Sequence, residues 1–265
     1  MSVIKAIFFD IDGTLYSHTT WSVPPSAMQA LHTLRKNGVR LFIATGRPPA
    51  NFERVRGNLE NFPFDGYLLF NGQLCADSTG QSFFLQALPV ESLQALVPWL
   101  AGQDIVCTFN ELDRTYRNRS AAHFAQKAAE MRLRLPELEV LDPVRSLSHP
   151  TYQINAYIPP EMDAEFIAHA PGLKSERWND LFSDIMPADG GKPRGMQRML
   201  DRFHIAREEC MAFGDGGNDI EMLRYAGIGV AMGNARPEVK PAADFVTSDI
   251  DEDGLAKALK HFELL

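Results

Sequence analysis

The chain has 265 residues, of which 45% are hydrophobic and 23% are charged, and these proportions exclude a largely disordered protein. Its formal net charge of −8, from 34 acidic residues against 26 lysines and arginines, argues against nonspecific nucleic-acid binding, which needs a basic surface. At roughly 150 residues per domain, the length allows one large domain or two small ones.

No apolar run approaches the roughly 18 residues that a membrane-spanning helix needs, and the N-terminus leads directly into a predicted strand without a signal-peptide pattern. The cysteines Cys75, Cys107 and Cys210 are widely spaced and form no Cys-x-x-Cys pair, which argues against a disulfide framework and a structural zinc site. We therefore expect buried cysteines in a reducing compartment, a cytoplasmic protein and no membrane partner.

The first 70 residues alternate between short apolar runs and amphipathic patterns. Nearly continuous apolar runs over 3–9, 39–44 and 65–70 predict strands that are buried on both faces of a sheet. Helical patterns over 24–36 and 48–59 separate these strands. Alternation of strands and helices with short connections predicts a Rossmann-like, doubly wound parallel sheet, an α/β fold.

The same alternation returns near the C-terminus. Strands are predicted over 210–213, 228–232 and 245–247, with one helix after Asp219 and a final helix over 254–262. The two ends of the chain therefore belong to one α/β core.

The middle of the chain has an α+β pattern instead. After the hairpin signal Asn71-Gly72, which ends the third core strand, the predicted elements of the middle are helix 90–100, an extended stretch 105–109, a strand near 114–117, helix 121–133, strand 152–158, helix 161–169 and a closing hairpin of 173–177 and 181–185. We therefore expect a core formed by residues 1–86 and 187–265, interrupted by an inserted α+β domain over 87–186.

Four carboxylates follow two of the core strands. Asp10 and Asp12 come at the end of the first strand, and Asp215 and Asp219 lie in a glycine-rich segment after the strand at 210–213. Ligands of open α/β sheets bind at the carboxyl ends of the strands, and clustered oxygen ligands favour Mg²⁺. Two simpler interpretations compete: Asp12 begins a common Asp-Gly turn, and Asp219 is an N-cap or first-turn acid that satisfies backbone N–H groups at a helix start.

Two further segments offer groups that bind phosphate. Thr45 and Gly46 provide a hydroxyl and backbone N–H groups just before a helix, which is an anion site. Lys192 follows two glycines and precedes a helix predicted from Arg194, where its ammonium could reach a phosphate or a carboxylate. The glycine-rich segments match neither the P-loop nor the Gly-x-Gly-x-x-Gly pattern, so nucleotide binding by either route loses support.

As a set, these segments resemble the motifs of the haloacid dehalogenase superfamily of phosphatases. The first strand with Asp-x-Asp-Gly-Thr is similar to its first motif, 44–47 to its second, Lys192 to its third and 214–219 to its fourth, in the correct order. The insertion between the second and third motifs resembles the C2 cap of subclass IIB, the Cof-like phosphatases. Pro-Arg-Gly follows Lys192, and we expect Gly195 to keep this helix start compact.

The resemblance implies a mechanism with named residues. Asp10 would be the nucleophile that forms an aspartyl-phosphate, and Asp12 would protonate the leaving group and then activate water. The implied Mg²⁺ ligands are the side chain of Asp10, the backbone carbonyl of Asp12 and the side chain of Asp215, with Asp219 as direct or indirect support. The implied phosphate-binding groups are Thr45, the N–H groups of Gly46 and Ile11, Lys192 and Asn218.

The resemblance also implies that the inserted cap closes over the site and selects a sugar phosphate or another small phosphorylated metabolite. Candidate substrate contacts are Arg47, Asn71, Arg114, Arg117 and Trp178. The competing interpretations are a solvated face or an ion pair for the arginines and a core position for Trp178. The sequence indicates no nucleic-acid partner and no obligate protein partner.

Three other functions remain open at this point. A phosphosugar mutase or phosphotransferase would use the same aspartyl-phosphate and differ in the acceptor. A receiver-like signalling protein would store a phospho-aspartate, although receivers lack a large insertion and the acid/base Asp12 favours turnover. A metal-binding protein without catalysis would not need the full set of acids.

Overall fold

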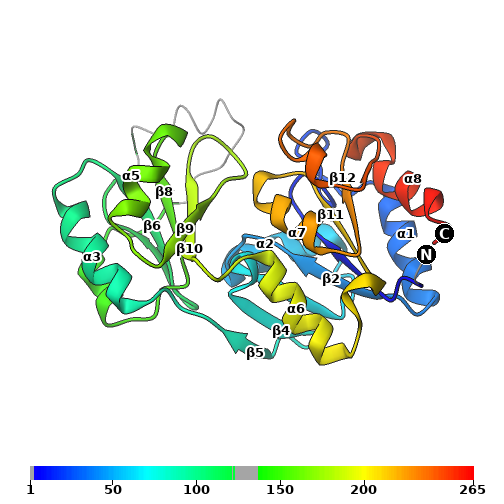
Figure 1. Cartoon of the computed structure of the whole chain (residues 1–265), viewed down its shortest axis with the longest axis horizontal. Helices are drawn as coiled ribbons and strands as arrows, with labels where there is room; N and C mark the ends of the chain where they lie inside the picture. Colours follow the sequence, from blue (N-terminus) through cyan, green and yellow to red (C-terminus); the bar gives the residue numbers. More distant parts are fainter. Residues whose placement is uncertain (1–2, 121, 123–136) are drawn as a thin grey trace. The chain divides into compact units, whose positions relative to one another are not determined.

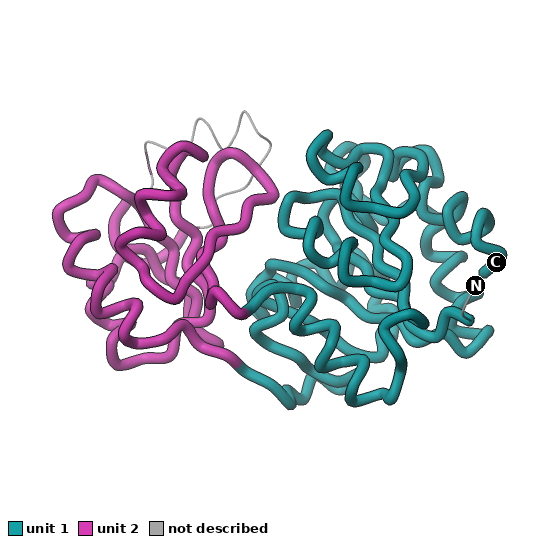
Figure 2. Tube along the Cα trace, in the orientation of Figure 1, with its two compact units in different colours: residues 1–85, 190–265 teal, residues 86–189 magenta. Residues whose placement is uncertain are grey.

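The computed structural model describes residues 3–120, 122 and 137–265. The chain divides into two units, coloured separately in Figure 2: unit 1 comprises residues 1–85 and 190–265, and unit 2 comprises residues 86–189. Unit 2 is therefore inserted into unit 1, and its limits differ by a few residues from the 87–186 expected from the sequence.

Unit 1 is built on an eight-stranded sheet with the strand order β13-β12-β11-β1-β2-β3-β4-β5 (Figure 1). Its strands are β1 (Ala6–Phe9), β2 (Arg40–Ala44), β3 (Gly66–Leu69), β4 (Leu74–Asp77), β5 (Ser82–Leu85), β11 (Cys210–Gly214), β12 (Ile228–Ala231) and β13 (Phe245–Val246). Strands β13 to β3 are all parallel, whereas β4 and β5 pair antiparallel. The predicted doubly wound sheet and the hairpin at Asn71-Gly72 are confirmed, while β5 was not predicted.

Helices cover both faces of this sheet. They are α1 (Pro25–Lys36), α2 (Pro49–Arg56), α6 (Lys192–Phe203), α7 (Ile220–Tyr225) and α8 (Gly254–His261). Phe8 of β1 and Phe42 of β2 stack at 4.9 Å between ring centroids and belong to the core cluster that α6 and α7 complete. Tyr67 of β3 points to the opposite face, where Phe52 of α2 packs against it. Burial on both faces explains the continuous apolar runs in these strands.

Helix α6 begins at Lys192, two residues before the start predicted from the sequence. Gly191 has φ +111°, which a side chain rarely allows, and Pro193 fits the first turn because its missing N–H needs no partner there. The first turn of α6 also lies against the turn after β3, since a Cβ on Gly195 would be only 2.9 Å from Gly72 Cα. This confirms the compact helix start expected from Gly195.

Unit 2 contains an antiparallel sheet with the order β7-β6-β8-β10-β9. Its strands are β6 (Val106–Asn110), β7 (Thr115–Arg117), β8 (Gln153–Tyr157), β9 (Leu173–Glu176) and β10 (Ser183–Pro187), and its helices include α3 (Val90–Ala101) and α5 (Asp163–Ala168). Leu96 of α3 and Phe166 of α5 join Phe109 and Ile154 of the sheet in one apolar core. The predicted α+β character is confirmed, and the helix predicted over 121–133 lies outside the described residues.

None of the helices that the structure describes has the length and apolar character needed to cross a membrane.

Candidate active site

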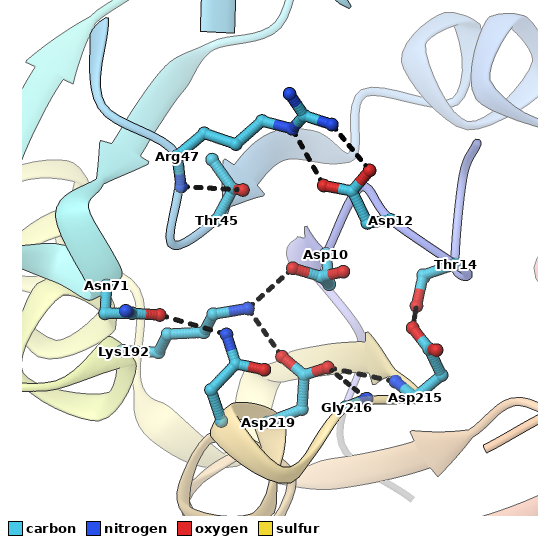
Figure 3. Close-up of polar contacts among 11 residues, drawn as sticks. Asp10, Asp12, Thr14, Thr45, Arg47, Asn71, Lys192, Asp215, Gly216 and Asp219 are labelled. Carbon is cyan, nitrogen blue, oxygen red and sulfur yellow. Dashed lines mark hydrogen bonds and ion pairs between the residues drawn. The ribbon is translucent and has the colours of Figure 1, made fainter. Parts of the chain in front are cut away.

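The carboxyl ends of β1, β2 and β11 lie side by side in unit 1, because these strands are parallel neighbours in the sheet. Asp10 follows β1, Thr45 follows β2, and Asp215 follows β11, while Lys192 enters from the first residue of α6 (Figure 3). The fold thus collects residues from both ends of the chain at one edge of the sheet, where open α/β sheets bind ligands.

Lys192 forms a buried ion pair with two carboxylates. Its Nζ donates to Asp10 Oδ1 and to Asp219 Oδ1, both at 2.6 Å (Figure 3). Lys192 and Asp219 are fully buried, and Asp10 is 6% exposed. Burial alone would lower the pKa of Lys192, but the two carboxylates raise it, so the side chain is an ammonium.

Asp219 shapes the loop after β11. Its Oδ2 accepts hydrogen bonds from the backbone N–H groups of Asp215 and Gly216, both at 2.9 Å, and its side chain does not cap α7. Asp219 is thus the first-turn acid of the short 3-10 helix Gly217–Asp219 and accepts from the N–H of its N-cap Gly216, as the simpler interpretation expected, and it pairs with Lys192 as well. Gly214 must be a glycine here, because a Cβ at this position would be 2.5 Å from Asp219 Cγ.

Asp10, Asp215 and Asp219 form an acidic cluster in which one oxygen of each lies within 4.8 Å of the others. Asp215 is held by Thr14, whose Oγ1 donates to Asp215 Oδ1 at 2.9 Å. Burial raises the pKa of Asp215 well above its ordinary value, and the carboxylates of Asp10 and Asp219 raise it further. Burial also raises the pKa of Asp10 to about 7, against the opposing effect of Lys192.

This donor set fits a divalent cation. When ionised, the three carboxylates carry three negative charges, and Lys192 offsets one of them, so the cluster lacks about two positive charges. Oxygen donors alone suit a hard ion. The cluster can therefore hold a divalent metal.

Asp12 has a different environment from Asp10. Arg47 donates from Nε to Asp12 Oδ2 and from Nη2 to Oδ1, each at 2.7 Å, and His18 Nε2 lies 3.1 Å from the same Oδ1. Burial would raise the pKa of Asp12, but His18 and Arg47 together hold it well below its ordinary range. The pKa of Asp10 is therefore raised and the pKa of Asp12 lowered, although the two residues are only two positions apart. The simple Asp-Gly turn interpretation does not account for this pairing.

The predicted phosphate-binding residues surround this edge of the sheet. Thr45 is 1% exposed, and its Oγ1 accepts the backbone N–H of Arg47 at 3.2 Å. Asn218 Nδ2 donates to Asn71 Oδ1 at 3.0 Å. Gly46 lies between Thr45 and Arg47 in the chain and Ile11 between Asp10 and Asp12, and the binding of phosphate by their N–H groups stays a prediction.

The candidate substrate contacts divide between the units. Arg47 and Asn71 lie in unit 1 and are bound to Asp12 and Asn218, and their contact with substrate stays a prediction. In unit 2, Arg114 forms an ion pair with Glu139, as one competing interpretation expected.

The other two candidates in unit 2 differ from the competing interpretations. Arg117 is only 6% exposed, its guanidinium lies 5.9 Å from the ring centroid of Tyr157, and its Nε and Nη2 have no hydrogen-bond partner among the described residues. The solvated-face interpretation is therefore wrong for Arg117, and the structure shows no ion pair of its guanidinium with another described residue. Trp178 is half-buried and packs against Phe182 outside the core cluster, so the core interpretation is wrong for it.

Sequence reasoning missed two side chains of this site, Thr14 and His18. Thr14 was part of the Asp-x-Asp-Gly-Thr pattern, but no spacing in the sequence indicates that its hydroxyl donates to Asp215, which is 201 positions away. His18 had no motif around it, because its contact with Asp12 depends on how the loop after β1 folds back.

Comparison with known proteins places this geometry in a family. Residues 7–259 match the family of haloacid dehalogenase-like hydrolases. YkrA of Bacillus subtilis is 32% identical over 262 residues, covering 98% of each chain. The HMP-PP phosphatase of Yersinia enterocolitica is 28% identical over 264 residues, covering 96% of this chain and 93% of the relative. The structure of a sugar phosphatase of HAD subclass IIB superposes with a TM-score of 0.88 and 36% identity, covering 98% of this chain and 100% of the other.

These matches span both units and the segments of all four motifs, and the sugar phosphatase structure superposes over 98% of this chain. The chain belongs to the haloacid dehalogenase-like hydrolases and is an enzyme of the phosphatase and phosphotransferase type found in subclass IIB.

Proposed function

We propose that the protein is a Mg²⁺-dependent phosphomonoester hydrolase that acts on a sugar phosphate or another small phosphorylated metabolite through an aspartyl-phosphate. The observation that carries this proposal is the pairing of Asp10 with Lys192 beside the acidic cluster, while Asp12 is held separately by Arg47. These separate environments support Asp10 as the nucleophile and Asp12 as the acid/base group.

Asp10 Oδ2 or Oδ1 attacks the phosphorus atom, and the bond from phosphorus to the leaving oxygen breaks. Asp12 is ionised while Arg47 holds it, so it takes up a proton from solvent once it has left Arg47 and then gives this proton to the leaving oxygen. A water molecule then attacks the phosphorus of the aspartyl-phosphate, Asp12 accepts its proton, and the bond from phosphorus to Asp10 breaks. Inorganic phosphate leaves, and Asp10 regains its carboxylate.

The residues around the cluster have roles in this scheme. Asp10 and Asp215, the backbone carbonyl of Asp12 and, directly or indirectly, Asp219 would hold Mg²⁺. When bound, the ion supplies positive charge that offsets the repulsion between a carboxylate and a phosphate dianion.

The phosphoryl oxygens need donors as well as positive charge. Lys192, Thr45, Asn218 and the N–H groups of Ile11 and Gly46 would bind them where charge develops. Removing one such donor costs about 3–4 kcal/mol of transition-state stabilisation in well-studied enzymes.

Unit 2 would select the leaving group, and the buried Arg117 and the half-buried Trp178 remain the candidate contacts there. The subclass IIB sugar phosphatase and the HMP-PP phosphatase support a small phosphorylated metabolite as substrate. The three free thiols support a cytoplasmic location.

The test is a screen of phosphate release with and without Mg²⁺ across sugar phosphates, nucleotides, pyridoxal phosphate and p-nitrophenyl phosphate. We expect Mg²⁺-dependent turnover by the wild type and none by Asp10→Asn, with an unchanged fold by circular dichroism. Asp104→Asn, which alters an exposed carboxylate of unit 2, is the matched control.

A near-normal rate in Asp10→Asn would overturn the assignment of the nucleophile. Product analysis separates hydrolysis from transfer, because a mutase or phosphotransferase would place the phosphoryl group on a second hydroxyl. A phospho-aspartate that persists after treatment with a small phosphodonor would instead support the receiver-like alternative.

A further inference from the structure

The loop that follows β1 is pinned in a defined conformation beside the site. Gly13 N–H donates to the carbonyl of Tyr16, and Ser17 N–H donates to the carbonyl of Ser22, both at 2.9 Å. Ser17 Oγ donates to Asp251 Oδ2 at 3.0 Å and so ties the loop to the C-terminal part of unit 1. The next residue, His18, therefore starts from a fixed backbone.

The ring of His18 is held by two aromatic neighbours. Tyr16 and Trp21 contact it edge-on, with ring centroids at 5.8 and 5.7 Å. This packing directs Nε2 toward Asp12, 3.1 Å from Oδ1, while 37% of the side chain remains exposed. Nε2, the buried end of the ring, thus lies beside the carboxylate, and it has no hydrogen-bond partner among the described residues in this arrangement.

Asp12 Oδ1 and Oδ2 are held unequally. Among the described residues, Oδ2 has one donor, Arg47 Nε, whereas Oδ1 is contacted by both Arg47 Nη2 and His18 Nε2. In the proposed reaction, one oxygen of Asp12 must exchange a proton with the leaving oxygen and then with water, so it cannot stay bound to Arg47. The singly held Oδ2 is the oxygen that can be released at the smaller cost.

We infer that His18 is a positioning residue for the acid/base Asp12: its Nε2, 3.1 Å from Oδ1, donates to Oδ1 and keeps it in place when Oδ2 leaves Arg47 and exchanges its proton. This inference rests on the proposed function. His18 would act by fixing the position of the Asp12 carboxylate and not by contacting the substrate.

The inference predicts a dependence on the leaving group. A sugar hydroxyl leaves as a strongly basic alkoxide and needs the proton of Asp12, whereas p-nitrophenolate is stable as an anion and needs it little. Misplacing Asp12 should therefore slow transfer from a sugar phosphate much more than transfer from p-nitrophenyl phosphate. The measure is kcat/KM, which reports the first phosphoryl transfer and not the later hydrolysis of the aspartyl-phosphate.

Three substitutions distinguish the contribution of the His18 Nε2 donor from that of its ring packing. His18→Gln can place an amide N–H where Nε2 lies, His18→Asn places its amide nearer the Nδ1 position, and His18→Phe keeps an aromatic ring between Tyr16 and Trp21 without a donor. Thr19→Ala, on the same loop and exposed, is the control. Each is assayed with p-nitrophenyl phosphate and with the sugar phosphate that the wild type turns over fastest.

We expect His18→Phe and His18→Asn to lower kcat/KM for the sugar phosphate at least ~10-fold more than for p-nitrophenyl phosphate, within the range of general acid catalysis. The loss should lie in kcat, with KM nearly unchanged. His18→Gln should recover most of the lost kcat for the sugar phosphate, and Thr19→Ala should match the wild type. Asp12→Asn should lose even more activity toward the sugar phosphate relative to p-nitrophenyl phosphate.

Equal losses with the two substrates, or no advantage of Gln over Asn, would overturn the positioning role while leaving the phosphatase intact. The Gln and Asn pair keeps the test valid even where His18→Phe fails to fold. A wild type with no Asp10-dependent turnover of any phosphomonoester would instead overturn the proposed function, and this inference with it.

Discussion

Lys192 Nζ lies 2.6 Å from Asp10 Oδ1, although the two residues are 182 positions apart in the chain. The ammonium is fully buried and also contacts Asp219, so it is the cation around which the carboxylates of the site are arranged. Four predictions follow from this arrangement and from the packing around it.

Lys192→Met should destabilise the metal-free protein, because it leaves the carboxylates of Asp10 and Asp219 buried without their cation. Removing one partner of a buried ion pair costs about 3–5 kcal/mol. The measurement is the free energy of unfolding in urea, and added Mg²⁺ should recover part of the loss. Lys36→Met, at the solvent-exposed end of α1, is the control, and an equal effect of the two substitutions would contradict the prediction.

Asp215→Asn should stabilise the metal-free protein at pH 8 and abolish its response to Mg²⁺. The raised pKa of Asp215 means that its ionised form is unfavourable in the fold, and the neutral amide removes that repulsion while its oxygen can still accept from Thr14. Each kcal/mol gained should raise Tm by about 2–4 °C. A lower Tm for the metal-free variant would show that the carboxylate is not under repulsion.

The shift in Tm caused by Mg²⁺ should be larger at pH 8 than at pH 5.5. Burial raises the pKa of Asp10 to about 7, so the folded metal-free protein binds this proton more tightly than the unfolded chain, whose aspartates titrate near about 4. As the pH rises from about 4 to about 7, the raised pKa therefore removes stability, and Mg²⁺ restores it. Thermal unfolding with and without Mg²⁺ measures the difference, and an equal shift at both pH values would contradict it.

Gly195→Ala should reduce both stability and activity. The added Cβ would be 2.9 Å from Gly72 Cα and 3.3 Å from the methyl groups of Leu68, so α6 must move, and Lys192 moves with it. Overpacking of this kind costs about 1–3 kcal/mol, and a displacement of 1 Å in an active site can cost about 10²-fold in rate. Gly57→Ala is the matched control, because its Cβ would meet no atom within 4 Å, and it should leave kcat/KM unchanged.

The arrangement of strand ends could be predicted from the sequence, since parallel neighbours end at the same edge of a sheet. Apolar runs followed directly by Asp10, Thr45 and Asp215 therefore indicated one common site. The fourth element, Lys192, was indicated by glycines before a helix, although the helix begins at the lysine itself and not at Arg194. Gly191, with its positive φ, allows this earlier start.

The contacts around Asp12 could not be predicted in the same way. They depend on the path of the loop that carries His18 and on the direction of the Arg47 side chain, and neither is fixed by periodicity or spacing. The burial of Arg117 was missed for a similar reason, because an arginine at the end of a short strand usually reaches solvent. The direction of side chains at strand ends and in loops could therefore not be predicted from the sequence.

The position of β1 has a consequence for the order in which the protein can fold. This strand lies between β2, which is synthesised soon after it, and β11, which is synthesised more than 200 residues later. A growing chain that has not yet released β11 from the ribosome has an unpaired edge on β1, and it also lacks Asp215 and Asp219. Unit 2, whose strands are contiguous in the sequence, can complete its own sheet earlier. The ability to bind metal should therefore arise late in synthesis, when the last strands close the sheet of unit 1.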